Sequence, residues 1–423
     1  MIFKKLTKQS AEPPIQETFV LALDVGTECV KALLAKLDGD QITVVGVGRK
    51  PQQPNDMHAG AIADIANVVK NCEAAVSEAE AQANVQASKV VMGIAGELVK
   101  GVTHTIRYRR PQPDKMLDEA EMDFIIDKVQ ERALEKAQKQ IAIETGNDNV
   151  EVKLVNSALV GIHIDGYKVS NPIGFQGRDV AIQIYTACAP MVHIGALERV
   201  AEELNLDLIA VSAEPFAVSR SVIGNDSASH FTSILIDVGG GTTDIAVVND
   251  GGVEGTKMFG IGGRSFTKTI SGDLNLSYKE AETLKINLAD ERIKKDIKQD
   301  ALMAVNKTLA VWLSGVELAL SEFDSVDQLP NQILLCGGGS SLIGMVEKLA
   351  DYKWPEDLPF TKQPTIKHIS LKDVVGVKDE TDSLNDHTLI MAVGLLRVGC
   401  DTMSIEPDEA AGLRDKINKF LRI

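Results

Sequence analysis

The residues best suited to chemistry in this sequence belong to one glycine motif that occurs twice. The first copy is Asp24-Val25-Gly26-Thr27, and the second copy covers residues 237–244. In each copy an apolar run typical of a β-strand leads into Asp-Val-Gly, and a second apolar run follows. Glycine allows a tight turn that approaches a ligand closely, and successive N–H groups in such a turn form a concavity that binds anions. The repeat therefore predicts two similar half-molecules that hold one polyphosphate between a first phosphate loop (24–27) and a second phosphate loop (237–244).

A third glycine run, 337–339, predicts a surface for a flat base. It follows an apolar run over 332–336 and precedes a stretch that favours a helix. Glycines let a ring lie against the main chain, and the start of a helix offers free N–H groups. An ordinary turn from strand to helix would need one glycine rather than three. We refer to residues 337–339 as the base loop.

Composition excludes several classes of function. A net charge of −16 argues against general nucleic-acid binding, which needs a basic surface. The five cysteines show no Cys-x-x-Cys pair and indicate a reducing compartment. No apolar run is long enough to cross a membrane, and the first residues lack the apolar core of a secretion signal. We therefore expect a cytoplasmic protein.

The elements that must position the loops follow from the hydrophobic pattern. Short apolar runs at 19–25, 29–37 and 42–48 predict a strand meander, and a helix is expected at about 60–83. Residues 88–180 differ in character, with a charged helix at about 117–143 between strand patterns, and this predicts a small inserted α+β subdomain. Further helices are expected at 191–204, within 277–323 and at 386–398.

With these motifs in this order, the chain resembles the superfamily of ATP-binding proteins that contains actin, heat-shock chaperones and sugar kinases. Within that superfamily it is most similar to the bacterial cell-division family FtsA. The stretches that carry the resemblance are 23–27, Gly60, 166–177, 237–245, 281–285, 336–339 and 392–396, and it covers about residues 18–400. It implies an α/β fold of actin-like (ribonuclease-H-like) type, with two duplicated lobes that bind ATP and a small inserted α+β subdomain.

The resemblance gives a division of the chain. The expected parts are a flexible leader at 1–17, a first lobe formed by 18–87, 181–212 and 386–400, the inserted subdomain at 88–180, a second lobe at 213–385, a linker at 401–411 and an amphipathic helix at 412–423.

The same resemblance assigns ATP and Mg²⁺ to the cleft between the lobes. Asp24 and Asp237 stand at the loop entrances, where carboxylates hold Mg²⁺ through its retained waters. Glu214 falls where the superfamily often places an acid that orients a water, so Glu214 and Asp237 are the candidate catalytic residues. A glutamate ahead of Pro215 is also an ordinary way to start a helix. Because phosphoryl transfer depends on positioning and charge neutralisation, we expect at most a slow ATPase.

The remaining nucleotide contacts follow from the loops and from the family. Glu282 and Lys285 lie three residues apart on one helix face and resemble contacts to the ribose and base, although a plain surface ion pair is the alternative. Gly262 and Gly263 either pass close to the phosphates or only turn the chain. The expected nucleotide-binding residues are Asp24, Gly26, Thr27, Gly239, Gly240, Gly241, Thr242, Thr243, Asp244, Gly262, Gly263, Glu282, Lys285, Gly337, Gly338 and Gly339.

The last twelve residues predict a contact with an anionic membrane surface. At 100° per residue, Leu413, Ile417, Phe420 and Leu421 fall within about a third of the helix circumference. Basic residues flank this apolar stripe, as in helices that lie in a lipid interface. A C-terminal helix docked on its own domain is the alternative.

By resemblance, the expected function is that of an FtsA-like protein. Such a protein self-associates, lies on the inner membrane surface and tethers the division ring by binding the C-terminal tail of FtsZ. The segment between Lys285 and Leu302 is shorter than in FtsA, in the subdomain that receives that tail, which leaves a PilM-like scaffold of pilus assembly as an alternative. A small-molecule kinase of the same superfamily is a third, but the sequence shows no second constellation for an acceptor.

Overall fold

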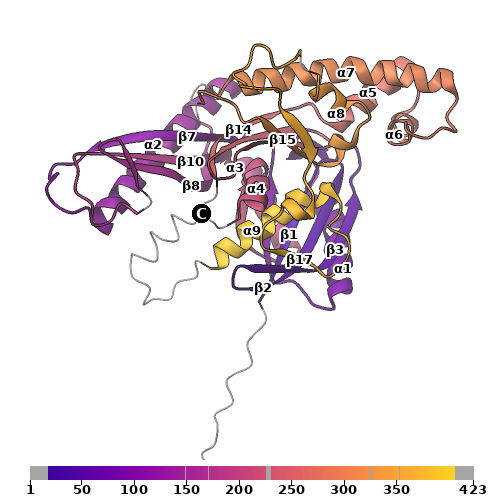
Figure 1. Ribbon diagram of the computed structural model, residues 1–423. Helices are drawn as coiled ribbons and strands as arrows, with labels where there is room; N and C mark the ends of the chain where they lie inside the picture. Colours follow the sequence, from indigo (N-terminus) through magenta and orange to yellow (C-terminus); the bar gives the residue numbers. More distant parts are fainter. Residues whose placement is uncertain are drawn as a thin grey trace, which may run out of the picture.

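The computed structural model describes residues 18–404 apart from 148, 170, 225–229, 324–325 and 352. The expected leader, most of the expected linker and the expected amphipathic helix lie outside the described residues. Two large sheets carry the rest of the chain, and the helices cover them (Figure 1).

The first sheet has six strands in the order β11-β6-β1-β2-β3-β17. Strands β1 (Thr18–Val25), β2 (Cys29–Asp38) and β3 (Gln41–Pro51) form the expected antiparallel meander. Strands β6 (Lys89–Ile94), β11 (Asp207–Ala213) and β17 (Val377–Asp379) extend it by parallel pairing. Because β1 turns directly into β2, the first phosphate loop lies at one end of this sheet.

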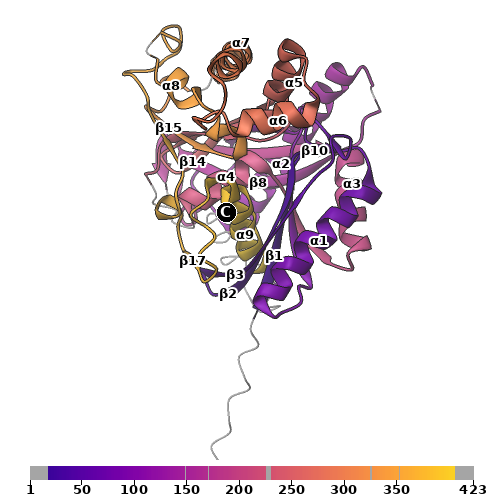
Figure 2. The ribbon, with the colours of Figure 1, turned by 90° about the vertical axis from the view of Figure 1, so that its right-hand side faces the viewer.

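Two helices cover one face of the first sheet and a third covers the other. Helix α1 (Ile65–Ala83) and helix α3 (Met191–Glu203) lie on one outer side, and α9 (Ile390–Met403) lies opposite (Figure 2). Helix α1 begins five residues later than expected because the Asp64 carboxylate caps it, accepting a bond from the N–H of Asn67 at 3.1 Å. Helix α9 continues through Met403, so the first residues of the expected linker are helical.

The second sheet has nine strands in the order β16-β15-β12-β13-β14-β7-β10-β8-β9. The meander of β12 (Ser233–Val238), β13 (Thr243–Asn249) and β14 (Gly252–Phe259) repeats the arrangement of β1–β3. Strands β15 (Gln332–Cys336) and β16 (Thr365–His368) add parallel partners beside β12. The two meanders place the two phosphate loops at equivalent positions of the two lobes, as the sequence repeat predicted.

Four helices complete the second lobe. They are α5 (Gly263–Leu274), α6 (Tyr278–Ile286), α7 (Lys295–Ser321) and the short α8 (Met345–Leu349). Helix α7 runs along the top edge in Figure 1 and packs a buried stripe that includes Trp312 and Leu309 against the sheet. Among the described residues between α6 and α7 there is no strand.

The rest of the second sheet is a side sheet formed by β7 (Lys100–Arg109), β8 (Val152–Ile164), β9 (Tyr167–Val169) and β10 (Asp179–Pro190). Helix α2 (Glu119–Thr145) covers it, with a core of its own that contains Met122, Ile125 and Ile182. The side sheet projects from the body of the molecule and joins the second lobe where β7 pairs with β14 at Gly255 and Thr256.

The boundaries of the inserted subdomain differ from those expected from the sequence, 88–180. Strand β6 lies inside the first sheet between β11 and β1, because its residues from Val90 to Ile94 are buried and need neighbours on both edges. At the other end, β10 continues to Pro190 and its Tyr185 packs into the main core.

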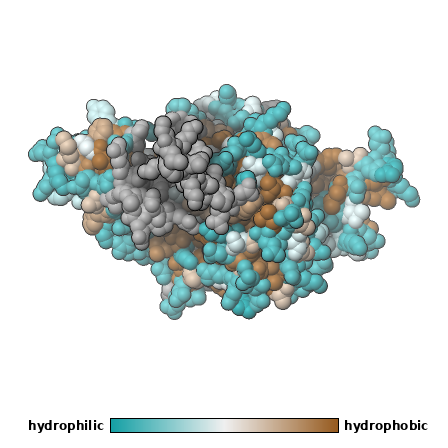
Figure 3. Space-filling view, turned by 90° about the horizontal axis from the view of Figure 1, so that it is seen from below, coloured by the Kyte–Doolittle hydropathy of each residue, from teal (hydrophilic) through white to brown (hydrophobic). Residues whose placement is uncertain are grey.

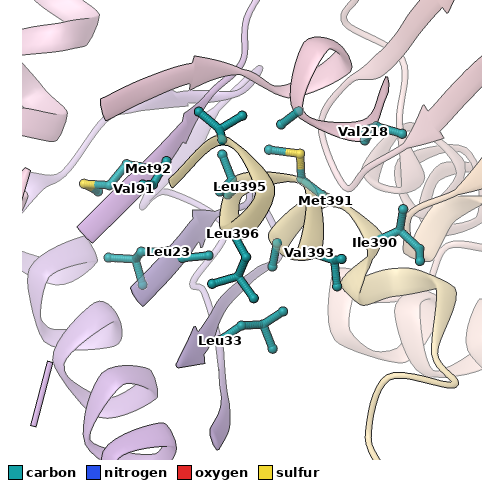
Figure 4. Close-up of a cluster of buried hydrophobic side chains, with 14 of the residues drawn as sticks. Leu23, Leu33, Val91, Met92, Val218, Ile390, Met391, Val393, Leu395 and Leu396 are labelled. Atoms are coloured by element: carbon teal, nitrogen blue, oxygen red, sulfur yellow. The ribbon is translucent and has the colours of Figure 1, made fainter. Parts of the chain in front are cut away.

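The lobes meet where α4 (Glu214–Ile223) crosses α9 at Gly394. A Cβ at Gly394 would lie 2.1 Å from the carbonyl oxygen of Ala217, so only glycine allows this approach. Figure 4 shows α9 directing Leu395 and Leu396 toward side chains of β1, β2 and β6, while Val218 of α4 lies on its other side. This crossing joins the core of the first lobe to the second.

One face of the molecule shows how polar and apolar residues mix at its surface. Seen from below, hydrophilic residues dominate the outline, with hydrophobic residues between them (Figure 3). None of the helices that the structure describes has the length and apolar character needed to cross a bilayer.

Candidate functional site: a cavity between two phosphate loops

The three glycine loops meet around one cavity of about 410 Å³ between the lobes. This volume lies in the range of small-molecule sites, roughly 300–1,000 Å³. Most of the expected site residues line it, namely Asp24, Gly26, Thr27, Glu214, Asp237, Gly239, Gly240, Thr242, Gly263, Glu282, Lys285, Gly337, Gly338 and Gly339. Four expected residues do not, namely Gly241, Thr243, Asp244 and Gly262.

The two phosphate loops pack directly against each other. A Cβ at Gly240 would lie 2.8 Å from the Cβ of Glu28, and a Cβ at Gly241 would lie 2.7 Å from the hydroxyl of Thr27. Any side chain at these two positions would push the lobes apart. Gly241 therefore serves the contact between the loops, although it does not face the cavity.

The start of α5 supports the second phosphate loop from behind. The N–H of Gly263 donates to the carbonyl of Gly239 at 2.9 Å, and the N–H of Arg264 donates to the carbonyl of Gly240 at 2.8 Å. A Cβ at Gly262 would lie 2.6 Å from the carbonyl oxygen of Gly239. Gly262 is thus a packing position that holds the loop in place.

The base loop reaches the second phosphate loop at its first residue. Gly337 has a φ of +79°, and a Cβ there would lie 2.0 Å from the Asp237 carboxylate. Gly338 has no atom within 4 Å of a Cβ position, so its main chain is open to the cavity. Apolar residues also line the cavity: Ile286, Leu288, Ala289, Leu342 and Ile343. The open main chain of the base loop and this apolar lining suit a flat ring.

Four carboxylates gather around the two phosphate loops. Asp24, Glu214 and Asp237 line the cavity, and Asp244 lies buried behind them. Burial raises the pKa of Asp237 to about 6, with Lys31 lowering it and Asp24 raising it. Burial also raises the pKa of Glu214 well above its usual range, assisted by the charges of Asp24 and Asp244.

Asp244 has one oxygen without a partner. Its Oδ2 accepts a bond from the Thr242 hydroxyl at 2.9 Å, whereas its Oδ1 has no hydrogen bond within the described part of the chain. Burial and the charge of Asp237 raise the pKa of this carboxyl well above its usual range. An unpartnered buried oxygen beside two further carboxylates is an environment that a cation or its bound water would stabilise.

Lys31 is a site residue that our sequence analysis did not select. Its Nζ lies 2.8 Å from Asp24 Oδ2, with only 16% of the lysine side chain exposed. Burial alone lowers the pKa of this ammonium group, but the Asp24 carboxylate more than offsets that effect and the pKa is raised. Side chains two apart on a strand point to the same face, so the position of Cys29 on β2 could have indicated that Lys31 also faces the cavity.

Glu282 and Lys285 form an ion pair in the cavity wall. Their side chains are 2.8 Å apart and 21% and 12% exposed. Lys285 also donates to the carbonyl of Gly263 at 3.0 Å and to the Thr267 hydroxyl at 2.9 Å. Thr267 in turn donates to Glu282. The pair therefore faces the cavity while fixing α6 to the start of α5.

Thr243 points away from the cavity because it alternates with Thr242 at the start of β13. Its hydroxyl donates to the carbonyl of Ile261 at 2.7 Å and accepts a bond from the Trp312 indole at 2.9 Å. The sequence predicts Thr243 as a nucleotide contact. In the structure its hydroxyl instead links the second phosphate loop to α7.

The residues present fit a hydrated cation better than a directly ligated one. Within the described residues, no three His, Cys, Asp or Glu side chains converge closely enough to hold a metal themselves. Mg²⁺ usually keeps several waters and takes only one or two carboxylates. Asp24 and Asp237 face the cavity in a way that suits this arrangement.

Comparison with known proteins supports the resemblance drawn from the sequence. The model of the family "Cell division protein FtsA" matches residues 234–394. The chain is 26% identical to FtsA of Neisseria meningitidis over 410 residues, which cover 91% of each chain. It is 25% identical to FtsA of Pseudomonas aeruginosa, with 91% of this chain and 90% of that protein covered.

A solved structure gives the fold independently of these sequences. A chain of the PilM-PilN type IV pilus biogenesis complex matches with a TM-score of 0.66 at 16% identity, covering 92% of this chain and 99% of that one. The chain has the expected actin-like α/β fold, which it shares with this chain of the pilus complex, and its predicted resemblance to FtsA is confirmed.

Proposed function

We propose that this chain, similar to FtsA along most of its length, is an actin-like cell-division protein that binds ATP with Mg²⁺ between its lobes. The observation that carries the proposal is the meeting of three separate glycine loops around one cavity. Each loop was expected to touch a different part of a nucleotide, and a structural turn would not require all three at one place.

The residues that line the cavity have different roles in binding ATP. Main-chain N–H groups of the two phosphate loops bind the phosphates, and the base loop with its apolar neighbours takes the ring. Asp24 and Asp237 would hold the waters of Mg²⁺, which would supply positive charge to the phosphates. Glu214, in its ionised form, would orient a water and take up its proton, and burial raises its pKa and so makes that carboxylate a stronger base. One such acid supports only slow hydrolysis.

Calorimetric titration with Mg-ATP tests the cavity assignment. Asp237→Ala removes a carboxylate at the phosphate end, and Gly240→Val forces the loops apart at Glu28. Each change should weaken binding by at least about 10-fold, the effect of losing a charge-assisted interaction. Gly272→Ala on α5, which has no atom near its Cβ position, is the matched control. Unchanged affinity in both cavity variants would remove ATP from this site.

The cellular role follows from the family rather than from the cavity. Similarity to FtsA supports self-association, attachment to the inner membrane surface through residues 412–423, and tethering of FtsZ through its C-terminal tail. Those C-terminal residues lie outside the described part of the chain.

A PilM-like scaffold is the second candidate, and two observations favour it. The PilM-PilN complex shares the fold over nearly its whole chain, and the connection between α6 and α7 contains turns rather than strands in its described residues. Titration with a fluorescent FtsZ tail peptide and, separately, a PilN peptide separates the two roles. Binding of only the PilN peptide would assign the chain to pilus assembly.

A further inference from the structure

Arg264 of α5 connects the two lobes. Among the described residues of α5, it alone has a side chain that forms hydrogen bonds with the first lobe. It stands at the start of the helix, directly after Gly263, and lines the cavity. Its side chain is 12% exposed. An arginine buried to this extent needs partners for its donors.

The guanidinium group directs all its nitrogens at the first lobe. Nε donates to the Glu28 carboxylate at 2.7 Å, and Nη2 donates to the carbonyl of Thr27 at 2.6 Å. Nη1 donates to the carbonyl of Pro54 at 2.9 Å, with a longer bond to that of Met57 at 3.3 Å. Nη2 has a second, longer bond to the carbonyl of Gln53 at 3.4 Å.

The main chain of the same residue binds the other loop. The N–H of Arg264 donates to the carbonyl of Gly240 at 2.8 Å. One residue therefore bonds the second phosphate loop through its backbone and the first phosphate loop through its side chain. It does so where Gly240 and Gly241 already bring the loops into contact with Glu28 and Thr27.

We propose that Arg264 is the positioning residue that assembles the nucleotide site, and that release of its side chain from the first lobe accompanies opening of the cleft for nucleotide exchange. Both phosphate loops must be in place at once for their N–H groups to converge on one polyphosphate. Breaking the bonds to Thr27, Glu28 and Pro54 frees the first lobe to move away. This inference rests on the proposed nucleotide function.

The geometry depends on a forked donor rather than on charge alone. Arginine offers five N–H donors in a fixed plane, whereas lysine offers three donors on one compact ammonium group. Lysine could keep the ion pair with Glu28 but could not reach the carbonyls of Thr27 and Pro54 at the same time. Arg264→Lys should therefore behave like Arg264→Gln.

Two measurements on the full chain test the proposal. Hydrogen–deuterium exchange of the nucleotide-free protein should be faster in both phosphate loops of Arg264→Gln and Arg264→Lys, because local opening becomes easier. Dissociation of a fluorescent ATP analogue with Mg²⁺, followed by stopped flow, should be faster by about 10- to 100-fold. Arg199→Gln is the control, since Arg199 is an exposed arginine of α3 paired only within its own helix.

The outcomes separate the two proposals. Exchange in the loops no faster than in the control, or dissociation at the wild-type rate, overturns the role of Arg264. Full rescue by lysine also overturns it in favour of simple charge pairing. If the wild-type chain binds no nucleotide, the proposed function fails, and the exchange comparison still decides whether Arg264 holds the loops together.

A milder variant covers the case in which Arg264→Gln does not fold. Glu28→Gln removes the charge from one partner and leaves the carbonyl contacts of Arg264 in place. It should raise exchange and dissociation by about 3- to 10-fold. A wild-type rate for both would count against the proposal.

Discussion

At the scale of residues, the acidic side chains around the cavity depend most on what the cleft holds. Asp237, Glu214 and Asp244 all have raised pKa values, and burial is the largest cause for each. Lys31 is committed to Asp24 by a short ion pair. With Lys31 paired to Asp24, the other three carboxyls of the cleft favour either protons or a cation with its phosphate ligand.

This arrangement predicts how stability changes with pH in nucleotide-free and Mg²⁺-free protein. The pKa of Asp237 rises from 3.8 to about 6 on folding. Such a carboxyl stabilises the fold fully below pH 3.8, and that contribution is lost as the pH rises through about 6. Relative to Asp237→Asn, the free energy of unfolding of the wild type should fall by about 2 kcal/mol between pH 4 and pH 7.

Urea unfolding at a series of pH values measures this difference. Glu214 and Asp244 titrate in both proteins with the same sign. Because the charge of Asp237 also helps to raise their pKa values, the difference reports Asp237 together with its coupling to these two carboxyls. A difference between the two proteins that stays constant from pH 4 to pH 7 would show that Asp237 is not withdrawn from water as the structure indicates.

At the scale of elements, glycines allow the main chains of neighbouring helices and strands to come into close contact, and these contacts fix how the elements pack. Helix α1 lies against β3 at Gly48, where a Cβ would be 1.8 Å from the carbonyl oxygen of Ala75. Helices α4 and α9 meet in the same way at Gly394 and Ala217, and a buried ion pair between Arg220 and Asp401 at 2.9 Å adds a second link. Movement of one lobe relative to the other would therefore change the packing of α4 against α9.

Gly394→Val should therefore destabilise the whole chain. The added side chain would force α4 away from α9, and overpacking of this kind costs about 1–3 kcal/mol or more. Thermal and urea unfolding measure the loss. Gly272→Ala in α5 is the matched control, because a Cβ there meets open space and the change should stabilise the helix by about 0.5–1 kcal/mol. Equal stability of the two variants would refute close packing at the crossing.

At the scale of the whole molecule, the side sheet packs on the second lobe through α4 and β14. Tyr185 of β10 stacks on Phe216 of α4, with ring centroids 5.3 Å apart, and its hydroxyl lies 3.1 Å from that of Thr256 on β14. Arg264 and Glu97 add further bridges between the lobes, the latter by accepting a bond from the N–H of Gly260 at 3.0 Å.

The proposed attachment to a membrane through residues 412–423 belongs to this scale, because a single short amphipathic segment would bind weakly. Four apolar side chains supply about 6–12 kcal/mol if fully buried, each basic residue adds about 1 kcal/mol at an anionic surface, and ordering the backbone costs about 1–2 kcal/mol per residue. Binding to vesicles should therefore rise more steeply than in proportion to protein concentration, since assembled copies bind with avidity.

Co-sedimentation with vesicles of anionic lipid checks this expectation. Deletion of 412–423, or Ile417→Glu combined with Phe420→Glu, should abolish binding and leave the unfolding temperature unchanged. A drop in the unfolding temperature with retained binding would mean that the segment docks on its own domain. Neutral vesicles serve as the control for the electrostatic part.

The sequence by itself determined the local features that glycine and hydrophobic period encode. The repeated Asp-Val-Gly motifs predicted two equivalent strand turns, and the third glycine run predicted the base loop. The apolar runs predicted the first meander and the two strands around the second phosphate loop, because burial of a strand face leaves a period of two in the residues that form it. The resemblance to FtsA then predicted that these features belong to two lobes.

Only the tertiary structure decided which residues meet across the lobes. The pairing of Arg264 with Thr27 and Glu28 joins positions more than two hundred residues apart, and no local pattern marks such a contact. Thr242 and Thr243 are neighbours in sequence, yet only the direction of β13 turns one toward the cavity and the other toward Trp312. The place of β6 in the first sheet was likewise set by strand pairing, which depends on the partners available in three dimensions rather than on the apolar run itself.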